Sequence, residues 1–509
     1  MPASTVGGFR EIVDAVKLLL VSPEIAPFMK TGAVAEGVSA LARALAQRGH
    51  DVTVAVPRYR AGEADDMEIV ERLPAIRLLE TSTPGSGYVD AQLFDAKVAS
   101  GPGPAAQPVK LLLVELPGFH EEHGIWGREL TDATDNARRF ALFSRAVLHE
   151  LRRETEAHVP FDIVHVHDWP GALIPYLLRE ARAEVPHTRS VLTIHNLVFQ
   201  GVFPVAAIGH LALDGDHSGD NRLGFFDRMS FLKGGIASAD AVVTVSPSYA
   251  REICTRRLGE GLDRLLASRP GGVHGIANGI DVELWDPATD PHLVANYDGR
   301  NPGNKALCKA ELVRELGFGR PDAPLVVSLG RVCGQKGSDL LAQAAEGIAS
   351  LGANVVVAGT GEADMVTALR SEAVANPGRF AYVGFAEEKL AHRIIAAGDV
   401  LVMPSRFEPC GIVQMYGQRY GTLPIAFRTG GLADTIVDLD AEPARGSGIL
   451  EENGTAGGLV SAVARGLRAI TSDEGDSVRF RIMSLPVGWG GPVQRYVQMY
   501  KQTMQARRA

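Results

Sequence analysis

The stretch from Val400 to Met415 reads VLVMPSRFEPCGIVQM. Its first four residues are a short apolar run bounded by proline, which is typical of a buried strand in a parallel sheet. Glu408 follows this run inside a segment bounded by proline and glycine. Because open α/β sheets bind their ligands beyond the carboxyl ends of their strands, we expect the Glu408 carboxylate to lie at a ligand site.

Two cations follow another apolar run in the same half of the chain. Residues 325–329 read LVVSL, and Arg331 and Lys336 come directly after them. An arginine fork and a lysine point charge both suit phosphate oxygens, and fixed cations stabilise the charge that builds up on a departing nucleoside diphosphate. Together with Glu408, these residues predict a site for a phosphorylated sugar. The alternative is that they are charges on surface loops.

Short β-branched runs alternate with longer amphipathic stretches along the chain, which is the pattern of βαβ units and parallel sheets. The pattern occurs twice. The expected strands are residues 17–22, 51–56, 109–114, 163–166, 190–194 and 241–245, and then 325–329, 354–358, 380–383, 399–403 and 423–427. The expected fold class is therefore α/β, with two doubly wound Rossmann-like domains facing each other across a cleft.

A stretch rich in Pro, Asp and Asn separates the two series and predicts a linker. The expected organisation is an N-terminal domain over residues 1–285, the linker 286–304, a C-terminal domain over 305–488, and a C-terminal helix over 489–509 that packs back onto a domain. Residues 82–108 are rich in Gly, Pro and Ser and predict a surface loop.

The composition is ordinary for a globular protein, with 46% apolar and 22% charged residues among 509. A net charge of −9 argues against a general nucleic-acid binder, which would usually be basic. Four scattered cysteines form no CxxC pair, so neither a disulfide framework nor a zinc site is expected, and a reducing cytoplasm fits. We find no secretory signal and no apolar stretch near the roughly 20 residues that span a bilayer. A cytoplasmic protein without nucleic-acid or membrane partners is expected.

Two glycine-containing turns are candidate phosphate sites. Lys30 and Gly32 lie between the first strand and a helix that begins near Val34, and a helix N-terminus favours phosphate. The alternative there is an ordinary strand–turn–helix corner. The turn at residues 429–431, between another strand and helix, is the second candidate. Asn278 precedes a glycine and reads first as a turn residue.

Histidines stand at the ends of two expected strands. His165 and His167 share a face by alternation, but no third ligand is apparent, so a metal site is not expected. We expect one of these groups, or Asp168, to face a sugar acceptor, with Trp169 offering an apolar face to a pyranose ring. His195 ends the next strand, where a catalytic and a structural role are both open.

Read together, these segments closely resemble bacterial glycogen synthase and plant starch synthase, glycosyltransferase family 5. The matching stretches are SPEIAPFMKTG (22–32), HDW (167–169), IHN (194–196), FLKGG (231–235), TVSPSYA (244–250), NGID (278–281), WDPATD (285–290), GR (330–331), QKG (335–337), the opening stretch, and TGGLAD (429–434). They run from about residue 17 to 500, nearly the whole chain.

The resemblance implies a GT-B fold and transfer of glucose from ADP-glucose or UDP-glucose to the 4-hydroxyl of an α-1,4-glucan, with retention of anomeric configuration. The N-terminal domain would face the glucan acceptor, and the C-terminal domain would bind the nucleotide sugar. Neither a cofactor nor a metal is implied, since Arg, Lys and helix ends stabilise the charge. A front-side route and a double displacement both stay open.

Site residues are implied by the same resemblance. The implied catalytic residues are Glu408, Arg331, Lys336 and His195. The implied substrate-binding residues are Lys30 and Gly32 near the donor, Asp168 on the acceptor side, Asn278, Cys410 and Gly411 around the glucose, and Thr429, Gly430 and Gly431 around the phosphates.

The chain departs from the family pattern in its N-terminal loop. The family normally reads Lys-Thr-Gly-Gly-Leu-x-Asp, whereas this chain has Ala33, Val34 and Glu36 in place of the second Gly, Leu and Asp. We expect a negative φ at Ala33, since alanine is a good residue for opening a helix. Two alternative functions stay open: a related GT-B transferase that glucosylates a small acceptor, and a non-catalytic glucan-binding homologue. Many retaining GT-B enzymes carry a second Glu eight residues after the first. This chain has Tyr416 at that position, as is usual in the glycogen synthase branch, and this counts against the small-acceptor alternative.

Overall fold

The computed structural model describes residues 15–59, 67–80, 87–98, 109–119, 133–212 and 221–506. By its internal contacts the chain divides into two units. Unit 1 consists of Met1–Ile194, Val198–Val242 and Val497–Ala509, and unit 2 consists of His195–Leu197 and Val243–Tyr496. The domain boundaries derived from the sequence stay a prediction.

The main sheet of unit 1 has a parallel centre and an antiparallel edge. Its strands are β1 (Lys17–Val21), β2 (Asp51–Pro57), β3 (Met67–Arg72), β4 (Ile76–Leu79), β5 (Tyr88–Val98), β6 (Val109–Glu115), β7 (Ile163–His167) and β8 (Arg189–Ile194). They run in the order β8-β7-β1-β2-β6-β5-β3, with β4 also paired to β5. The pairs from β8 to β6 are parallel, whereas β5 pairs antiparallel with β6, β3 and β4.

Apolar runs and helical spacing explain the core of unit 1. Its helices and minor strands are α1 (Ala33–Ala46), α2 (Ala133–Glu156), α3 (Asp168–Gly171), α4 (Leu173–Glu180), β9 (Val202–Pro204), the 3-10 helix η2 (Val205–Leu211), β10 (Gly224–Phe225), β11 (Arg228–Ser230) and α5 (Phe231–Ser238). In β1, Leu18 to Leu20 are fully buried, as expected for a strand covered on both faces. Val38, Leu41 and Leu45 form the buried face of α1 at helical spacing.

Unit 2 contains a six-stranded parallel sheet. Its strands are β14 (Leu325–Leu329), β15 (Asn354–Ala358), β16 (Phe380–Val383), β17 (Val400–Met403), β18 (Leu423–Phe427) and β19 (Ile449–Glu451), in the order β16-β15-β14-β17-β18-β19. Every pair in this sheet is parallel. Counted from β14 the order is 3-2-1-4-5-6, that of doubly wound dinucleotide folds. The order reverses between β14 and β17, and ligands bind at such a switch point.

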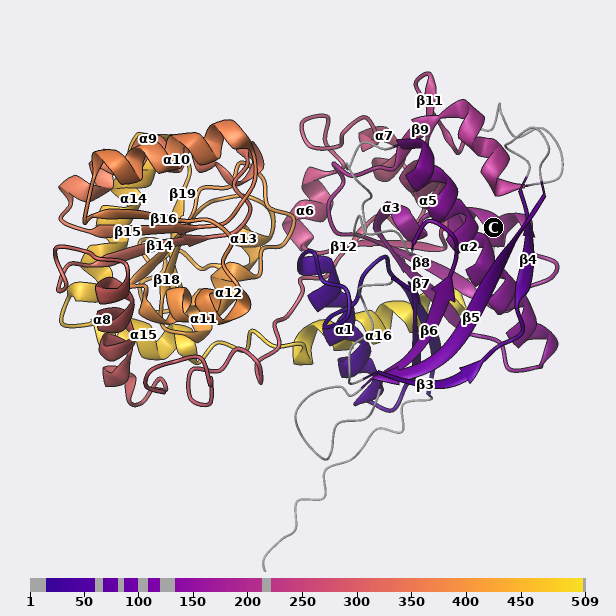
Figure 1. The fold of residues 1–509 in the computed structure, drawn as a ribbon, viewed down its shortest axis with the longest axis horizontal. Helices are drawn as coiled ribbons and strands as arrows, with labels where there is room; N and C mark the ends of the chain where they lie inside the picture. Colours follow the sequence, from indigo (N-terminus) through magenta and orange to yellow (C-terminus); the bar gives the residue numbers. More distant parts are fainter. Residues whose placement is uncertain are drawn as a thin grey trace, which may run out of the picture. The chain divides into compact units, whose positions relative to one another are not determined.

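Helices cover both faces of this sheet, as Figure 1 shows with α9 and α10 on one side and α11 and α12 on the other. Further elements of this part of the chain are β12 (Ala241–Thr244), α6 (Pro247–Glu252), α7 (Asp263–Ala267), β13 (His274–Gly275), η3 (Pro302–Asn304), α8 (Lys305–Glu315), η4 (Gly334–Lys336), α9 (Ser338–Ser350), α10 (Ala363–Ala375), α11 (Glu388–Ala397), α12 (Val413–Arg419), α13 (Gly430–Thr435), α14 (Ala456–Thr471), α15 (Gly475–Met483) and α16 (Gly490–Gln505).

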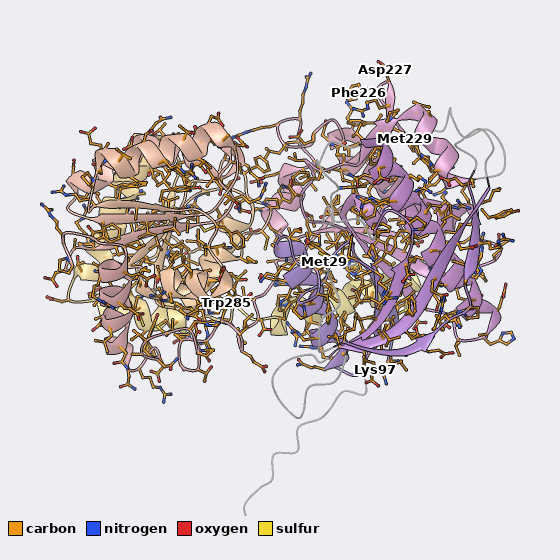
Figure 2. The ribbon with its side chains drawn as sticks, in the orientation of Figure 1. Met29, Lys97, Phe226, Asp227, Met229 and Trp285 are labelled. Atoms are coloured by element: carbon orange, nitrogen blue, oxygen red, sulfur yellow. The ribbon has the colours of Figure 1, made fainter. Side chains whose placement is uncertain are left out.

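Trp285 and parts of the expected linker 286–304 contribute buried side chains to unit 2. The ring of Trp285, labelled in Figure 2, stacks between those of His392 and Tyr416, with centroids 3.8 and 3.7 Å away. The buried Asp290 carboxylate lies 2.8 Å from His392 Nδ1 and accepts a hydrogen bond from Tyr420 at 2.6 Å. Trp285, Asp290 and Tyr297 are therefore buried within unit 2, whereas most residues between 286 and 304 are exposed or partly exposed.

The expected parallel strands of both series are present within one or two residues of their predicted ends. The C-terminal helix is α16, and its residues from Val497 onward belong to unit 1. The surface loop predicted for residues 82–108 is wrong in part. Tyr88–Val98 form β5, whose alternating burial fits a strand with one covered face, and residues 82–86 and 99–108 lie outside the described residues.

None of the helices in the described part of the chain combines the length and the apolar character that crossing a bilayer requires.

Candidate functional site

Lys336 and Glu408 meet at the switch point of the unit 2 sheet. Lys336 follows β14 and Glu408 follows β17, and the Lys336 ammonium group forms an ion pair with Glu408 Oε2. Glu408 is buried, while the Lys336 side chain keeps 27% of its surface exposed. Ser405 Oγ donates to the same carboxylate oxygen at 3.2 Å. The structure thus joins two sequence-predicted residues that lie 72 positions apart.

Gly337 makes the approach of these two loops possible. Its φ is +68°, and a Cβ built there would lie 2.0 Å from the carbonyl oxygen of Pro404. Only glycine tolerates both the left-handed backbone and that close contact. The residue therefore brings the turn after β14 against the end of β17 and places Lys336 beside Glu408.

Arg331 lies on the exposed side of the same turn. Its guanidinium donates to Gln335 Oε1 at 3.1 Å, and Gln335 Nε2 donates to the Phe407 carbonyl at 3.4 Å. Asn196 Nδ2 also donates to Gln335 Oε1, at 3.5 Å. Gln335 thus links Arg331 to the loop of Glu408, so both predicted cations lie close to that loop.

The turn at Thr429 to Gly431 contacts the Glu408 loop through its backbone. A Cβ on Gly430 would lie 2.0 Å from the Glu408 carbonyl oxygen, and a Cβ on Gly431 2.0 Å from that of Cys410. The Gly431 N–H donates to the Glu408 carbonyl at 2.9 Å. The Gly430 N–H donates to Glu252 Oε1, also at 2.9 Å. Both glycine donors of the predicted phosphate cradle are engaged by protein oxygens, so its role stays a prediction.

Cys410 and Asn278 are buried beside this group, and Gly411 is partly exposed. Burial raises the pKa of the Cys410 thiol to about 12, against a smaller opposing effect of a backbone hydrogen bond with Asn278. The thiol is therefore neutral near pH 7 and suits packing better than nucleophilic attack. Gly411 has a φ of +69°, and a Cβ there would meet the amide of Gln414 at 2.5 Å.

His195, grouped with unit 2, is half-buried. Desolvation lowers its pKa to about 4. The imidazole is consequently neutral near pH 7, so it can exchange hydrogen bonds with a sugar but adds no positive charge.

In unit 1, Lys30 and Gly32 lie at the start of α1. Lys30 Nζ lies 2.6 Å from Glu36 Oε1. Gly32 is the residue before the helix and has an extended φ of −168°. Ala33 opens the helix and is absent from the described residues with positive φ, which confirms the expected negative φ.

Glu24, which sequence reasoning missed, stabilises this loop through hydrogen bonds. Its buried carboxylate accepts hydrogen bonds from the Thr31 N–H at 2.8 Å and from Thr31 Oγ1 at 2.7 Å. Burial raises the pKa of Glu24, while hydrogen bonds from Thr31, Ala35 and Gly32 act in the opposite direction. The loop that leads into α1 is therefore hydrogen-bonded to the buried Glu24 carboxylate. The only signal in the sequence was an acid directly after Ser-Pro at a strand end.

Asp168 occupies a strained position at the start of α3. Its φ is +57°, which is uncommon for a residue other than glycine and is found more often at functional sites. His165 has a structural role, because Thr193 Oγ1 and Tyr500 OH lie 2.6 and 2.7 Å from its ring nitrogens. Among the described residues no group of three or more His, Cys, Asp or Glu side chains is arranged to hold a metal ion.

The expectation that Trp169 offers a face to a sugar is wrong. The side chain is buried, and its ring packs edge-on against Phe140 and Phe203, with centroids 4.9 and 5.6 Å away. A Cβ on Gly201 would lie 2.6 Å from the ring. Trp169 is a core residue, which its position beside Asp168 in the sequence could not reveal.

Comparisons with known proteins agree over nearly the whole chain. The family described as "Starch synthase catalytic domain" matches residues 17–268, and "Glycosyl transferases group 1" matches residues 316–480. A glycogen synthase from Anaeromyxobacter sp. (strain Fw109-5) is 40% identical, covering 96% of this chain and 99% of the relative. A glycogen synthase from Opitutus terrae is 36% identical, covering 96% and 100%.

A solved structure is similar as well. The catalytic domain of starch synthase IV from Arabidopsis thaliana, bound to ADP and acarbose, superposes with a TM-score of 0.84 at 27% identity. The match covers 97% of this chain and 100% of that one.

Proposed function

The chain belongs to the family of starch synthases and bacterial glycogen synthases and is a glycosyltransferase, and we propose that it elongates an α-1,4-glucan with glucose from ADP-glucose. Transfer goes to the 4-hydroxyl at the non-reducing end, with retention of anomeric configuration. The observation that carries the proposal is the Lys336–Glu408 pair at the switch point of β14 and β17. A cation for a phosphate and a carboxylate for a sugar stand side by side there.

Lys336 and Arg331 are proposed to bind the donor's phosphates. As the bond between glucose and the diphosphate breaks, negative charge grows on the distal phosphate. A positive charge held in place beforehand stabilises that state more than the bound substrate. Two contacts support this role for Lys336, since the Gly337 turn and the ion pair with Glu408 hold its position. No metal or cofactor is required in this proposal.

Glu408 is proposed to hold the glucose and to favour the positive charge that develops on its ring. Its carboxylate is buried and already balanced by Lys336 and Ser405. His195 and Asn278 are proposed to contact the sugar hydroxyls, with His195 neutral. Both routes to retention stay open: a front-side route in which the leaving phosphate accepts the acceptor's proton, and a double displacement.

We propose ADP-glucose rather than UDP-glucose as the donor because the similar starch synthase structure is described as bound to ADP and acarbose. That ligand pair belongs to the other protein, and it supports this chain's donor choice only through the family membership.

The test is incubation of purified protein with radiolabelled ADP-glucose or UDP-glucose and glycogen, followed by precipitation of the glucan. Label in glycogen that α-amylase releases supports the synthase. Label transferred only to a small sugar favours the small-acceptor alternative. Glucan binding without transfer from either donor favours the non-catalytic homologue. Proton NMR of the first product made on a maltooligosaccharide reports the anomeric configuration, and a β-linkage would contradict retention.

A further inference from the structure

Lys30 forms an ion pair with a glutamate at the position where the family pattern has an aspartate. Lys30 Nζ lies 2.6 Å from Glu36 Oε1, with 34% and 24% of the two side chains exposed. Glu36 stands in the first turn of α1, and Lys30 lies in the loop just before it. The glutamate reaches one methylene further than the expected aspartate. The departure seen in the sequence thus has a structural consequence at a proposed donor-binding residue.

Two features favour this ion pair. The loop backbone is anchored, since the buried Glu24 carboxylate accepts hydrogen bonds from both the N–H and the hydroxyl of Thr31. The carboxylate of Glu36 is favoured where it stands, because a helix N-terminus stabilises a negative charge in its first turn. Lys30 therefore extends from an anchored backbone towards a carboxylate whose charge the helix end favours.

We propose that Glu36 is a positioning residue that competes with the donor's phosphate for Lys30 and thereby weakens the binding of the nucleotide sugar. The inference rests on the proposed function and on the donor-binding role that the family resemblance implies for Lys30. An ammonium group carries one charge and three donors, so an arriving phosphate must displace the carboxylate or share the ammonium with it. Either arrangement places a second negative group beside the phosphate and raises the free energy of the bound state.

The size of the effect follows from the exposure of the pair. Partly exposed ion pairs contribute about 0.2–1 kcal/mol, and salt screens them. Removing the competing charge should therefore lower the donor KM about 1.4- to fivefold. Turnover should stay unchanged, because the interaction is lost equally from the ground state and the transition state.

Glu36→Gln is the decisive variant, since it keeps the shape of the side chain and removes its charge. Its donor KM and kcat are measured beside those of Lys30→Ala and Glu36→Asp. The Glu36→Asp variant keeps the carboxylate on a side chain that is one methylene shorter. The matched control is Glu442→Gln, which removes the same charge from the exposed ion pair of Glu442 with Arg445 in unit 2. The expected results are a lower KM for Glu36→Gln, a smaller decrease for Glu36→Asp, a higher KM for Lys30→Ala and no change for the control.

An unchanged or higher KM in Glu36→Gln overturns the inference, and so does an unchanged KM in Lys30→Ala. A Glu36→Gln protein that melts several degrees lower with a raised KM shows a purely structural role and overturns it as well. If the wild type transfers glucose from neither donor, the proposed function fails separately. The comparison then rests on calorimetric Kd values for ADP, and only tighter binding by Glu36→Gln supports the inference.

Discussion

Glu408 is a buried carboxylate whose charge is balanced by the ammonium group of Lys336. Burying a charge is costly unless it is paired and hydrogen-bonded. Lys336 therefore has two roles, since it stabilises the folded loop and offers a cation to the proposed phosphate. When a phosphate draws Lys336 towards itself, the Ser405 hydroxyl and the hydroxyls of the sugar must keep the carboxylate satisfied. In the proposed function, donor binding and the charge balance of Glu408 are coupled through this one side chain.

The two predicted cations should respond differently to removal. Arg331→Ala is expected to lower kcat about 10²- to 10³-fold with an unchanged melting temperature, because its guanidinium is exposed. Lys336→Ala is expected to lose activity and also about 1–3 kcal/mol of stability, since it strands the Glu408 carboxylate. Kinetics and denaturant unfolding measure both. The double variant Lys336→Ala/Glu408→Gln should regain stability but not activity. Near-normal turnover of Arg331→Ala would remove Arg331 from the phosphate site.

His195 predicts a specific acid sensitivity. Desolvation lowers its pKa from 6.5 to about 4. As the pH falls through this window, the unfolded chain binds a proton that the folded chain does not, so stability decreases by about 1.4 kcal/mol per pH unit at most. His195→Asn should flatten the decline of the melting temperature between about pH 6.5 and 4.5. The exposed His158→Asn is the control. Equal slopes in the wild type and His195→Asn would contradict the prediction.

At the scale of elements, the turn between β14 and α9 positions the site. Gly337→Ala would force a Cβ to within 2.0 Å of the Pro404 carbonyl oxygen at a φ of +68°. Gly352→Ala is the matched control, since its φ is +84° and nothing lies within 4 Å of its Cβ position. The control should cost about 1–2 kcal/mol through the backbone alone. Gly337→Ala should cost more and should also lower kcat. Equal stability losses in urea unfolding, with kcat unaffected, would show that the contact can relax.

The sequence predicted the parallel strands because strands buried on both faces are short, continuous apolar runs. It placed Glu408, Arg331 and Lys336 at strand ends for the same reason. It could not predict that Lys336 contacts Glu408, because that contact depends on β17 lying next to β14, with β15 and β16 intervening in the sequence. The antiparallel strand β5 was missed because glycine, proline and serine flank it and polar residues interrupt its apolar ones.

At the scale of the whole molecule, the net charge is unfavourable for the proposed anionic donor. The net charge is −9, so long-range attraction does not favour a nucleoside diphosphate, and binding must depend on local cations. In unit 2 these are the proposed phosphate contacts Arg331 and Lys336. Nucleotide binding, and the rise in melting temperature that it causes, should therefore depend on very few residues.

We expect ADP to raise the melting temperature of the chain and UDP to raise it less. A ligand at about 100 times its Kd stabilises the folded state by about 2.7 kcal/mol, which corresponds to a shift of about 5 °C for a unit of this size. Differential scanning fluorimetry measures the shift at equal concentrations of the two nucleotides. Because the proposed phosphate contacts are side-chain cations rather than a metal, EDTA should leave the ADP shift intact. Arg331→Ala should abolish most of it, whereas Glu442→Gln should not, since Glu442 pairs with Arg445 away from β14 and β17. A larger shift with UDP would reverse the proposed donor preference, and a shift that disappears in EDTA would show that a divalent cation carries the phosphates.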